Sequence, residues 1–105
     1  MTDFVEPEIT VTRNKEAGRY EIHVGDVLGG FTEFADHGHG ALFSRTEIDP
    51  AFEGRGLAKR LVSEALADIA RRGETLVPEC PFVVRYVNKN TVEGLNVDWA
   101  RASDH

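Results

Sequence analysis

The sequence has a single cysteine, so no disulfide can form within the chain. It also has no apolar run approaching the roughly 20 residues that a membrane-spanning helix needs. Its first residues (1–7) are acidic and lack the apolar segment of a signal peptide. These absences argue against a membrane protein and predict a chain that works in the reducing environment of the cytoplasm.

Positive charge is also scarce, since 12 lysines and arginines stand against 18 aspartates and glutamates, a net charge of −6. This balance argues against direct binding of nucleic acid and is compatible with a cationic substrate such as an amine. The 105 residues, of which 41% are hydrophobic and 29% charged, predict one globular domain over residues 1–105 with a core of modest size. We expect a monomer or a weak dimer.

Alternation of apolar and polar residues predicts four strands in the first half of the chain and a shorter buried strand later. The predicted strands cover residues 9–13, 19–24, 27–34, 41–48 and 75–78. The segment 36–40 is expected to be a flexible loop, and Gly29 and Gly30 predict a β-bulge. Apolar residues at helical spacing predict a helix of about four turns that ends at Gly73. A second helix is expected from Pro81 to about Asn88.

This order of elements predicts an α+β fold built on a mostly antiparallel mixed sheet. One right-handed βαβ crossover joins the strands 41–48 and 75–78, and a helix lies near the C-terminus. The tail after Gly94 is ambiguous. The aromatic residues are expected to pack in the core, and they are Phe31, Phe34, Phe43, Phe52, Phe82 and Trp99.

The most informative motif is the loop Glu53-Gly54-Arg55-Gly56-Leu57-Ala58, which leads directly into the first helix. Its two glycines allow backbone N–H groups to converge, and the helix N-terminus adds unpaired donors and a positive dipole end. The loop also lies at the carboxyl end of a strand, where α/β sheets bind ligands. This arrangement suits a pyrophosphate, although two glycines before a helix can equally form a simple turn.

Positive side chains at the start of this helix strengthen the phosphate interpretation. Arg55, Lys59 and Arg60 oppose the helix dipole, so they are unfavourable there unless an anion lies nearby. The alternative is that they form a solvated helix face.

Three segments together resemble the minimal YjdJ-type branch of the GNAT acetyltransferase superfamily. They are Thr46-Glu47-Ile48-Asp49-Pro50, the glycine loop, and Val77-Pro78-Glu79-Cys80-Pro81-Phe82. The resemblance covers residues 20–90 and implies a small GNAT-like fold. It also implies that acetyl-CoA, which leaves as coenzyme A, is the cosubstrate and binds between two splayed parallel strands. The implied acceptor is a primary amine, either a lysine side chain of a protein or a small amine.

The resemblance assigns cofactor contacts by position. The glycine loop would hold the CoA pyrophosphate, the backbone around Thr46 to Ile48 would follow the pantetheine arm, and the end of the second helix would lie near the pantetheine or the 3′-phosphate. The implied cofactor-binding residues are Thr46, Ile48, Glu53, Gly54, Arg55, Gly56, Leu57, Ala58, Asn88 and Lys89.

Cys80 and Glu47 are the candidate catalytic residues. Cys80 is expected at the N-cap of the second helix or just before it, where the dipole favours a thiolate. It would either accept the acetyl group or lie beside the thioester and shape the site, and the alternative is a small buried hydrophobe. Glu47 would accept a proton from an ammonium substrate, directly or through water. The alternative for Glu47 is a surface carboxylate paired with Arg45, on the same face of the strand.

One residue departs from the family pattern, because Arg45 stands where members of this branch usually carry histidine. An arginine stays protonated and cannot act as a general base. Tyr86 is as consistent with a core residue as with a group that protonates the leaving thiolate. His37 and His39 lack the further ligands that a metal site needs, so no metal is predicted.

The leading hypothesis is therefore an acetyl-CoA-dependent N-acetyltransferase. The alternative is a CoA-binding or acyl-CoA-binding module, or a sensor, with little or no turnover. A purely structural domain is the third possibility.

Overall fold

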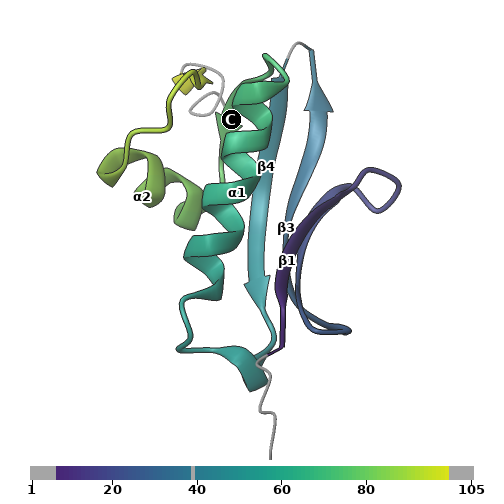
Figure 1. Cartoon of the computed structure of the whole chain (residues 1–105). Helices are drawn as coiled ribbons and strands as arrows, with labels where there is room; N and C mark the ends of the chain where they lie inside the picture. The colour runs from purple at the N-terminus through teal and green to yellow at the C-terminus, as the bar shows by residue number, and fades with distance from the viewer. Residues whose placement is uncertain (1–6, 39, 100–105) are drawn as a thin grey trace, which may run out of the picture.

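The structure, a computed structural model, describes residues 7–38 and 40–99 and is built on a six-stranded sheet (Figure 1). The strands are β1 (Ile9–Asn14), β2 (Arg19–Val24), β3 (Val27–His37), β4 (Gly40–Ile48), β5 (Thr75–Pro78) and β6 (Asn96–Val97). The helices are the short 3₁₀-helix η1 (Pro50–Phe52), α1 (Leu57–Arg71) and α2 (Pro81–Lys89). The strands lie in chain order, β1 to β4 antiparallel and β4 to β6 parallel, so the predicted α+β fold with a mixed sheet is confirmed.

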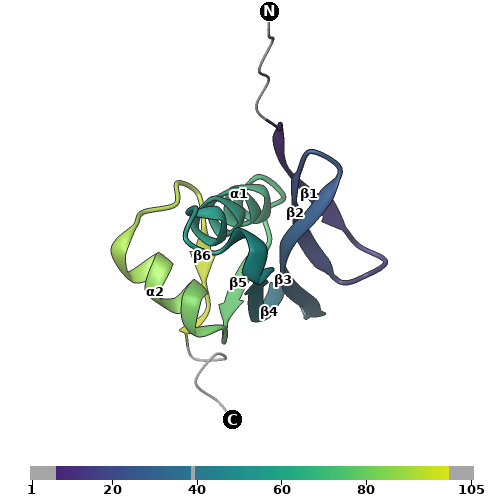
Figure 2. The same ribbon diagram turned by 90° about the horizontal axis from the view of Figure 1, so that it is seen from below.

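The core lies between the sheet and α1. The apolar residues of α1 that follow one helical face are all buried, and they are Leu57, Leu61, Val62, Ala65, Leu66 and Ile69. They pack in one cluster with Tyr20, Phe34 and Phe43 of the sheet, whose rings lie 5.2–6.1 Å apart. Seen from below, α1 has β1 and β2 on one side and α2 on the other (Figure 2). Burial of this apolar surface supplies the main driving force for the fold.

Two β-bulges shape the sheet near its centre. Gly29 has no opposite residue on β2, which confirms the predicted bulge. Ser44 likewise has no opposite residue on β3, and this second bulge was not predicted. Next to the first bulge, a Cβ at Gly30 would lie 2.5 Å from the carbonyl oxygen of Glu47. Glycine is therefore required for β3 to approach the end of β4.

Three local predictions are wrong. The loop predicted over residues 36–40 is a tight hairpin, because β3 continues to His37, β4 begins at Gly40, and Gly38 turns between them with φ 66°. Trp99 is not a core residue, since 44% of it is exposed. Phe31 lies outside the core cluster, with the guanidinium groups of Arg19 and Arg45 at 4.7 and 5.4 Å from its ring.

The tail also contains an element that was not predicted. β6 pairs with β5 in parallel, which adds a second crossover through α2. A strand of two residues is too short to show the alternation on which strand prediction rests. None of the described helices is long and apolar enough to cross a membrane.

Candidate functional site

The glycine loop after β4 adopts a conformation that depends on its glycines. Gly54 and Gly56 have φ values of 84° and 75°, which non-glycine residues rarely adopt. A Cβ at either position would meet no protein atom within 4 Å, so the space beside the loop is open. Asp49 fixes the approach to the loop because its carboxylate caps η1, accepting a hydrogen bond from the Ala51 N–H at 2.9 Å.

A hollow of about 280 Å³, here called the loop hollow, lies beside these glycines. It is lined by Ile48, Phe52, Glu53, Gly54, Gly56, Leu57 and Ala58. Gly56 is the N-cap of α1 and has no side chain to satisfy the first turn. Among the described residues, no hydrogen bond takes the N–H of Leu57, Ala58 or Lys59 as donor. The hollow therefore offers unpaired donors at a helix N-terminus, which suits an anion.

The three positive side chains expected around this loop do not gather at one point. Arg60 points away from it, because its guanidinium binds Glu64 at 2.8 Å and the Ile9 carbonyl at 3.2 Å. Arg55 lies over the ring of Phe52, 5.3 Å from its centroid. Lys59 lies on the side of α1 that faces α2 and lines a second hollow there.

This second hollow, the basic hollow, measures about 210 Å³ and is lined by Lys59, Phe82, Arg85, Tyr86, Lys89 and Asn90. Of the two predicted contacts on α2, Lys89 belongs to it, whereas Asn88 is exposed and lines none of the hollows described here. Sequence reasoning missed Arg85 and Asn90 as site residues. The four-residue spacing of Arg85 and Lys89 on one helix face is a signal that could have found Arg85.

β4 and β5 separate before β4 reaches the glycine loop, as the resemblance implies. Their pairing ends at Phe43 and Pro78, after which the Phe43 carbonyl accepts hydrogen bonds from the N–H groups of Glu79 and Cys80 at 3.0 and 2.9 Å. The chain then turns into α2 at Pro81. Within the described residues, the stretch 44–48 of β4 is left without a partner strand on this side. An unpaired strand edge offers its N–H and C=O groups to an extended ligand.

Cys80 lies at this point of separation and is the N-cap of α2, as predicted. Its Sγ lies 3.3 Å from the Thr46 hydroxyl, which lies 2.8 Å from the Thr32 hydroxyl. Cys80 is only 3% exposed and Thr32 is fully buried. The thiol is therefore held in a hydrogen-bonded row across three elements, and the Thr32 member of this row was missed by sequence reasoning.

Glu47 belongs to the opposite face of β4, because neighbouring strand residues alternate between faces and Thr46 faces the core side. Its carboxylate forms an ion pair with the Arg45 guanidinium at 2.9 Å. The same guanidinium lies 3.3 Å from the carboxylate of Glu33. The pairing with Arg45, given in the sequence analysis as the alternative for Glu47, is therefore present. Glu47 and Asp49 line a third hollow of about 230 Å³, together with Phe31 and neighbouring residues of β3 and β4. Two carboxylates and an aromatic ring suit a cationic amine.

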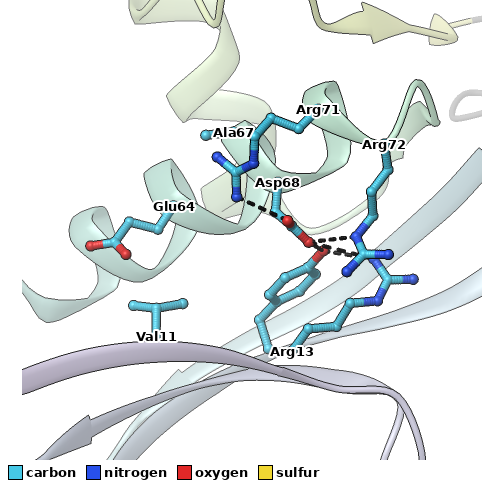
Figure 3. Close-up of a pocket in the computed structure, with 8 residues that line it drawn as sticks. Val11, Arg13, Glu64, Ala67, Asp68, Arg71 and Arg72 are labelled. Carbon is cyan, nitrogen blue, oxygen red and sulfur yellow. Dashed lines mark hydrogen bonds and ion pairs between the residues drawn. The ribbon is translucent and has the colours of Figure 1, made fainter.

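A separate charged cluster joins the β1–β2 hairpin to the far end of α1 (Figure 3). Asp68 accepts hydrogen bonds from Tyr20 at 2.6 Å, Arg72 at 2.7 Å and Arg71 at 2.9 Å, and Arg13 donates to the Tyr20 hydroxyl at 2.7 Å. Burial, followed by the hydrogen bond to Asp68, raises the pKa of Tyr20 to about 12. Burial alone would raise the pKa of Asp68, but the donors around it outweigh burial and lower it to about 2. These hydrogen bonds hold the β1–β2 hairpin against the C-terminal end of α1, so the cluster has a structural role.

The described residues contain no group of three or more histidine, cysteine or acidic side chains that could hold a metal ion. His39 lies outside the described residues, and so do Ser103, Asp104 and His105 of the tail.

Comparison with known protein families finds a match. The family model described as GCN5-related N-acetyl-transferase matches residues 19–94, from β2 to the segment after α2. The matched segment includes the glycine loop, the separation of β4 and β5, and Cys80. No curated protein matches the chain significantly.

Proposed function

The chain belongs to the GCN5-related N-acetyltransferase family, and we propose that it transfers the acetyl group of acetyl-CoA to a primary amine, either a lysine side chain or a small amine. The observation that carries this proposal is the position of the loop hollow, at the end of the unpaired stretch of β4. The free N–H groups of the loop suit a diphosphate, and the open edge of β4 that leads to them suits an extended chain. Together they suit a long ligand that carries a diphosphate.

The residues of the chain then have separate tasks. The backbone from Glu53 to Ala58 holds the diphosphate, and the edge of β4 from Thr46 to Ile48 follows the pantetheine arm. Backbone N–H groups near the Ser44 bulge stabilise the oxyanion as the amine attacks and the thiolate leaves. Most of the rate gain comes from holding the amine and the thioester together. The amine keeps the acetyl group, and its proton passes to Glu47 or to water.

Burial and the contact with Thr46 support a positioning role for Cys80 beside the thioester, with direct transfer to the amine. An acyl-enzyme would need the Thr46–Cys80 contact to break and the thiol to become accessible. Glu47 is half-exposed, with 54% of its side chain in solvent, so it can meet an amine that approaches from outside.

The second candidate function is a CoA-binding module or sensor with little turnover. The ion pairs of Arg45 favour this second function. The Arg45 guanidinium lies between Glu33 and Glu47, so the carboxylate proposed to accept the proton is already paired. We also propose, from the three motif segments, that the chain belongs to the minimal YjdJ-type branch. That it works in the cytoplasm as a monomer or a weak dimer is likewise a proposal.

Turnover separates the two functions. We expect calorimetry to show micromolar binding of acetyl-CoA, and a thiol-release assay to show transfer to a lysine peptide or to spermidine. Glu47→Gln should keep the affinity for acetyl-CoA and lower kcat/KM by about 100-fold. Binding without transfer to any amine would leave the sensor. Absence of binding would contradict both functions.

A second prediction concerns the thiol. Cys80→Ala is expected to leave the affinity for acetyl-CoA within about threefold and to lower kcat by about tenfold or less, because a positioning residue adds little to the barrier. Mass spectrometry after mixing with acetyl-CoA should show no acetylated protein. A stable acetyl adduct on the wild type, together with complete loss of transfer in Cys80→Ala, would instead establish a covalent route.

A further inference from the structure

Thr32 places a hydroxyl inside the apolar core, because the residue is fully buried on β3. In residues 7–38 and 40–99, this hydroxyl has one hydrogen-bond partner, the Thr46 hydroxyl at 2.8 Å. Burying a hydroxyl is unfavourable, and valine would fill nearly the same space without a polar atom. Packing alone therefore gives no reason for a hydroxyl at this position.

The number of protons gives the direction of the Thr32–Thr46–Cys80 row. Each hydroxyl donates one hydrogen bond and accepts up to two, whereas a thiol is a weak donor and a weak acceptor. The Thr32 proton has only the Thr46 oxygen as an acceptor in the described part of the chain, so Thr32 donates to Thr46. The Thr46 proton is then directed at Sγ of Cys80, 3.3 Å away. The thiol accepts within the row, and its own S–H points elsewhere.

The opposite direction would leave a buried proton without an acceptor. If Cys80 donated to Thr46 and Thr46 to Thr32, the Thr32 proton would have no acceptor among the described residues. An unpaired hydroxyl costs more than an unpaired thiol, because the S–H group is the weaker donor. The row also ends at a fully buried residue, so it has no exit to solvent and carries no proton in or out. Its effect is to orient the thiol.

The S–H group left over lies where β4 and β5 separate. The Cys80 N–H donates to the Phe43 carbonyl at 2.9 Å, which fixes the backbone at this N-cap. Thr46 belongs to the stretch 44–48 of β4, which has no partner strand on this side within the described residues. A ligand chain that follows this edge therefore passes close to Sγ. Because Cys80 is only 3% exposed, solvent offers its S–H little alternative.

We propose that Thr32 is a positioning residue that fixes the direction of the row, so that the Cys80 S–H donates a hydrogen bond to the sulfur of the leaving coenzyme A. The inference rests on the proposed function, because it assumes that the thioester lies at the separation of β4 and β5. No bond to Cys80 forms or breaks. The C–S bond of the thioester breaks, its electron pair stays with the sulfur of coenzyme A, and the proton of the amine goes to Glu47 or to water.

A hydrogen bond to this sulfur favours the transition state over the bound cosubstrate. The sulfur of a thioester is a weak acceptor, but it gains negative charge as the C–S bond breaks. A charged acceptor strengthens the hydrogen bond, and the buried surroundings of Cys80 strengthen it further. The orientation that Thr32 imposes should therefore raise kcat and leave KM almost unchanged.

Infrared spectroscopy tests the proposal directly, because the chain has one cysteine and so one S–H stretching band. The ligand is S-methyl-coenzyme A, whose thioether sulfur accepts a hydrogen bond, does not react and brings no S–H of its own. Its binding should move the wild-type band to lower wavenumber, whereas desulfo-coenzyme A, which lacks the sulfur, should bind without this shift. Binding of S-methyl-coenzyme A without a shift would overturn this inference alone. Failure of acetyl-CoA and both analogues to bind would overturn the proposed function as well.

Thr32→Val tests the direction of the row. Without the Thr32 proton, the Thr46 oxygen is available to Cys80, so the S–H turns into the row. The band of the free variant should then lie at lower wavenumber than that of the wild type, and S-methyl-coenzyme A should no longer move it. Thr32→Ser keeps the hydroxyl and should behave as the wild type. Equal bands in the wild type and Thr32→Val would overturn the proposal.

Kinetics separate this role from a purely structural one. Thr32→Val should lower kcat by about fivefold, the effect of one neutral hydrogen bond, and leave KM for acetyl-CoA within about twofold. In a Cys80→Ala background the same substitution should lower kcat no further, because Thr32 acts through the thiol. A loss that persists undiminished in that background would overturn the proposal.

Ile22→Val is the control for a general disturbance of the core. Ile22 is fully buried on β2 and belongs to the core cluster, so its substitution removes a methylene group from the same side of the sheet. It should lower stability and leave both kcat and the S–H band unchanged. The same drop in kcat in this variant as in Thr32→Val would show that Thr32 acts only through packing, which would also overturn the proposal.

Discussion

Gly56→Val is expected to lower the affinity for acetyl-CoA by about 100-fold or more, measured by calorimetry. Gly56 has φ 75°, and a side chain there costs roughly 1–2 kcal/mol, more when it is β-branched. No protein atom lies within 4 Å of a Cβ at this position, so the side chain would enter the open space where the diphosphate is proposed to bind. The variant therefore loses both the loop conformation and the room for the ligand.

Gly73→Val provides a matched control at the other end of α1. Gly73 has φ 69° and the same open surroundings, so its substitution imposes similar backbone strain far from the loop hollow. It should lower stability without lowering affinity. Should Gly56→Val fail to fold, Gly56→Ala should still show a smaller loss of affinity. Wild-type affinity in a folded Gly56→Val variant would contradict the assignment of the diphosphate to this loop.

Asp68→Asn is expected to lower the free energy of unfolding at pH 7 by about 1–2 kcal/mol, which corresponds to a melting temperature lower by on the order of 5–10 °C. Asp68 is the common acceptor for Tyr20, Arg71 and Arg72, and its side chain is 19% exposed. The figure allows for screening by solvent at the edge of the charged cluster. Urea denaturation of both proteins measures the difference.

The pH dependence of this difference identifies its cause. The pKa of Asp68 falls from 3.8 to about 2 on folding, so ionised Asp68 stabilises the folded state above pH 3.8. This contribution should decline as the pH falls through about 2. Glu64→Gln, on the exposed face of α1, is the control and should change stability by no more than about 0.5 kcal/mol. A difference that persists undiminished at low pH would show that the ionisation of Asp68 is not its source.

Local pattern was enough to predict most of the secondary structure and one part of the site. The apolar positions of α1 repeat at helical spacing, and every one of them is buried as expected. Positive φ at Gly54 and Gly56 follows from the same local logic, because glycine adopts this backbone at little cost. The N-cap position of Cys80 could also be predicted, since Pro81 marks the first turn of α2.

Other features depended on contacts between distant segments. The bulge at Ser44 arises from the register between β3 and β4, and no glycine marks it in the sequence. Arg60 was expected near the loop, but its partner Ile9 is 51 residues away in the chain. The Thr32–Thr46–Cys80 row likewise joins residues from β3, β4 and the start of α2.

The sequence by itself determined the order of β1 to β5 with α1 and α2, the buried face of α1 and the open glycine loop, because these follow from spacing within a single turn, strand or helix. Only the tertiary structure decided which charges remain free. Lys59, Arg85 and Lys89 meet because α1 and α2 pack side by side, whereas Arg13, Arg71 and Arg72 are neutralised around Asp68 and Glu74. The free energy of a charge depends on what lies within a few ångströms of it, and the folded chain sets that distance.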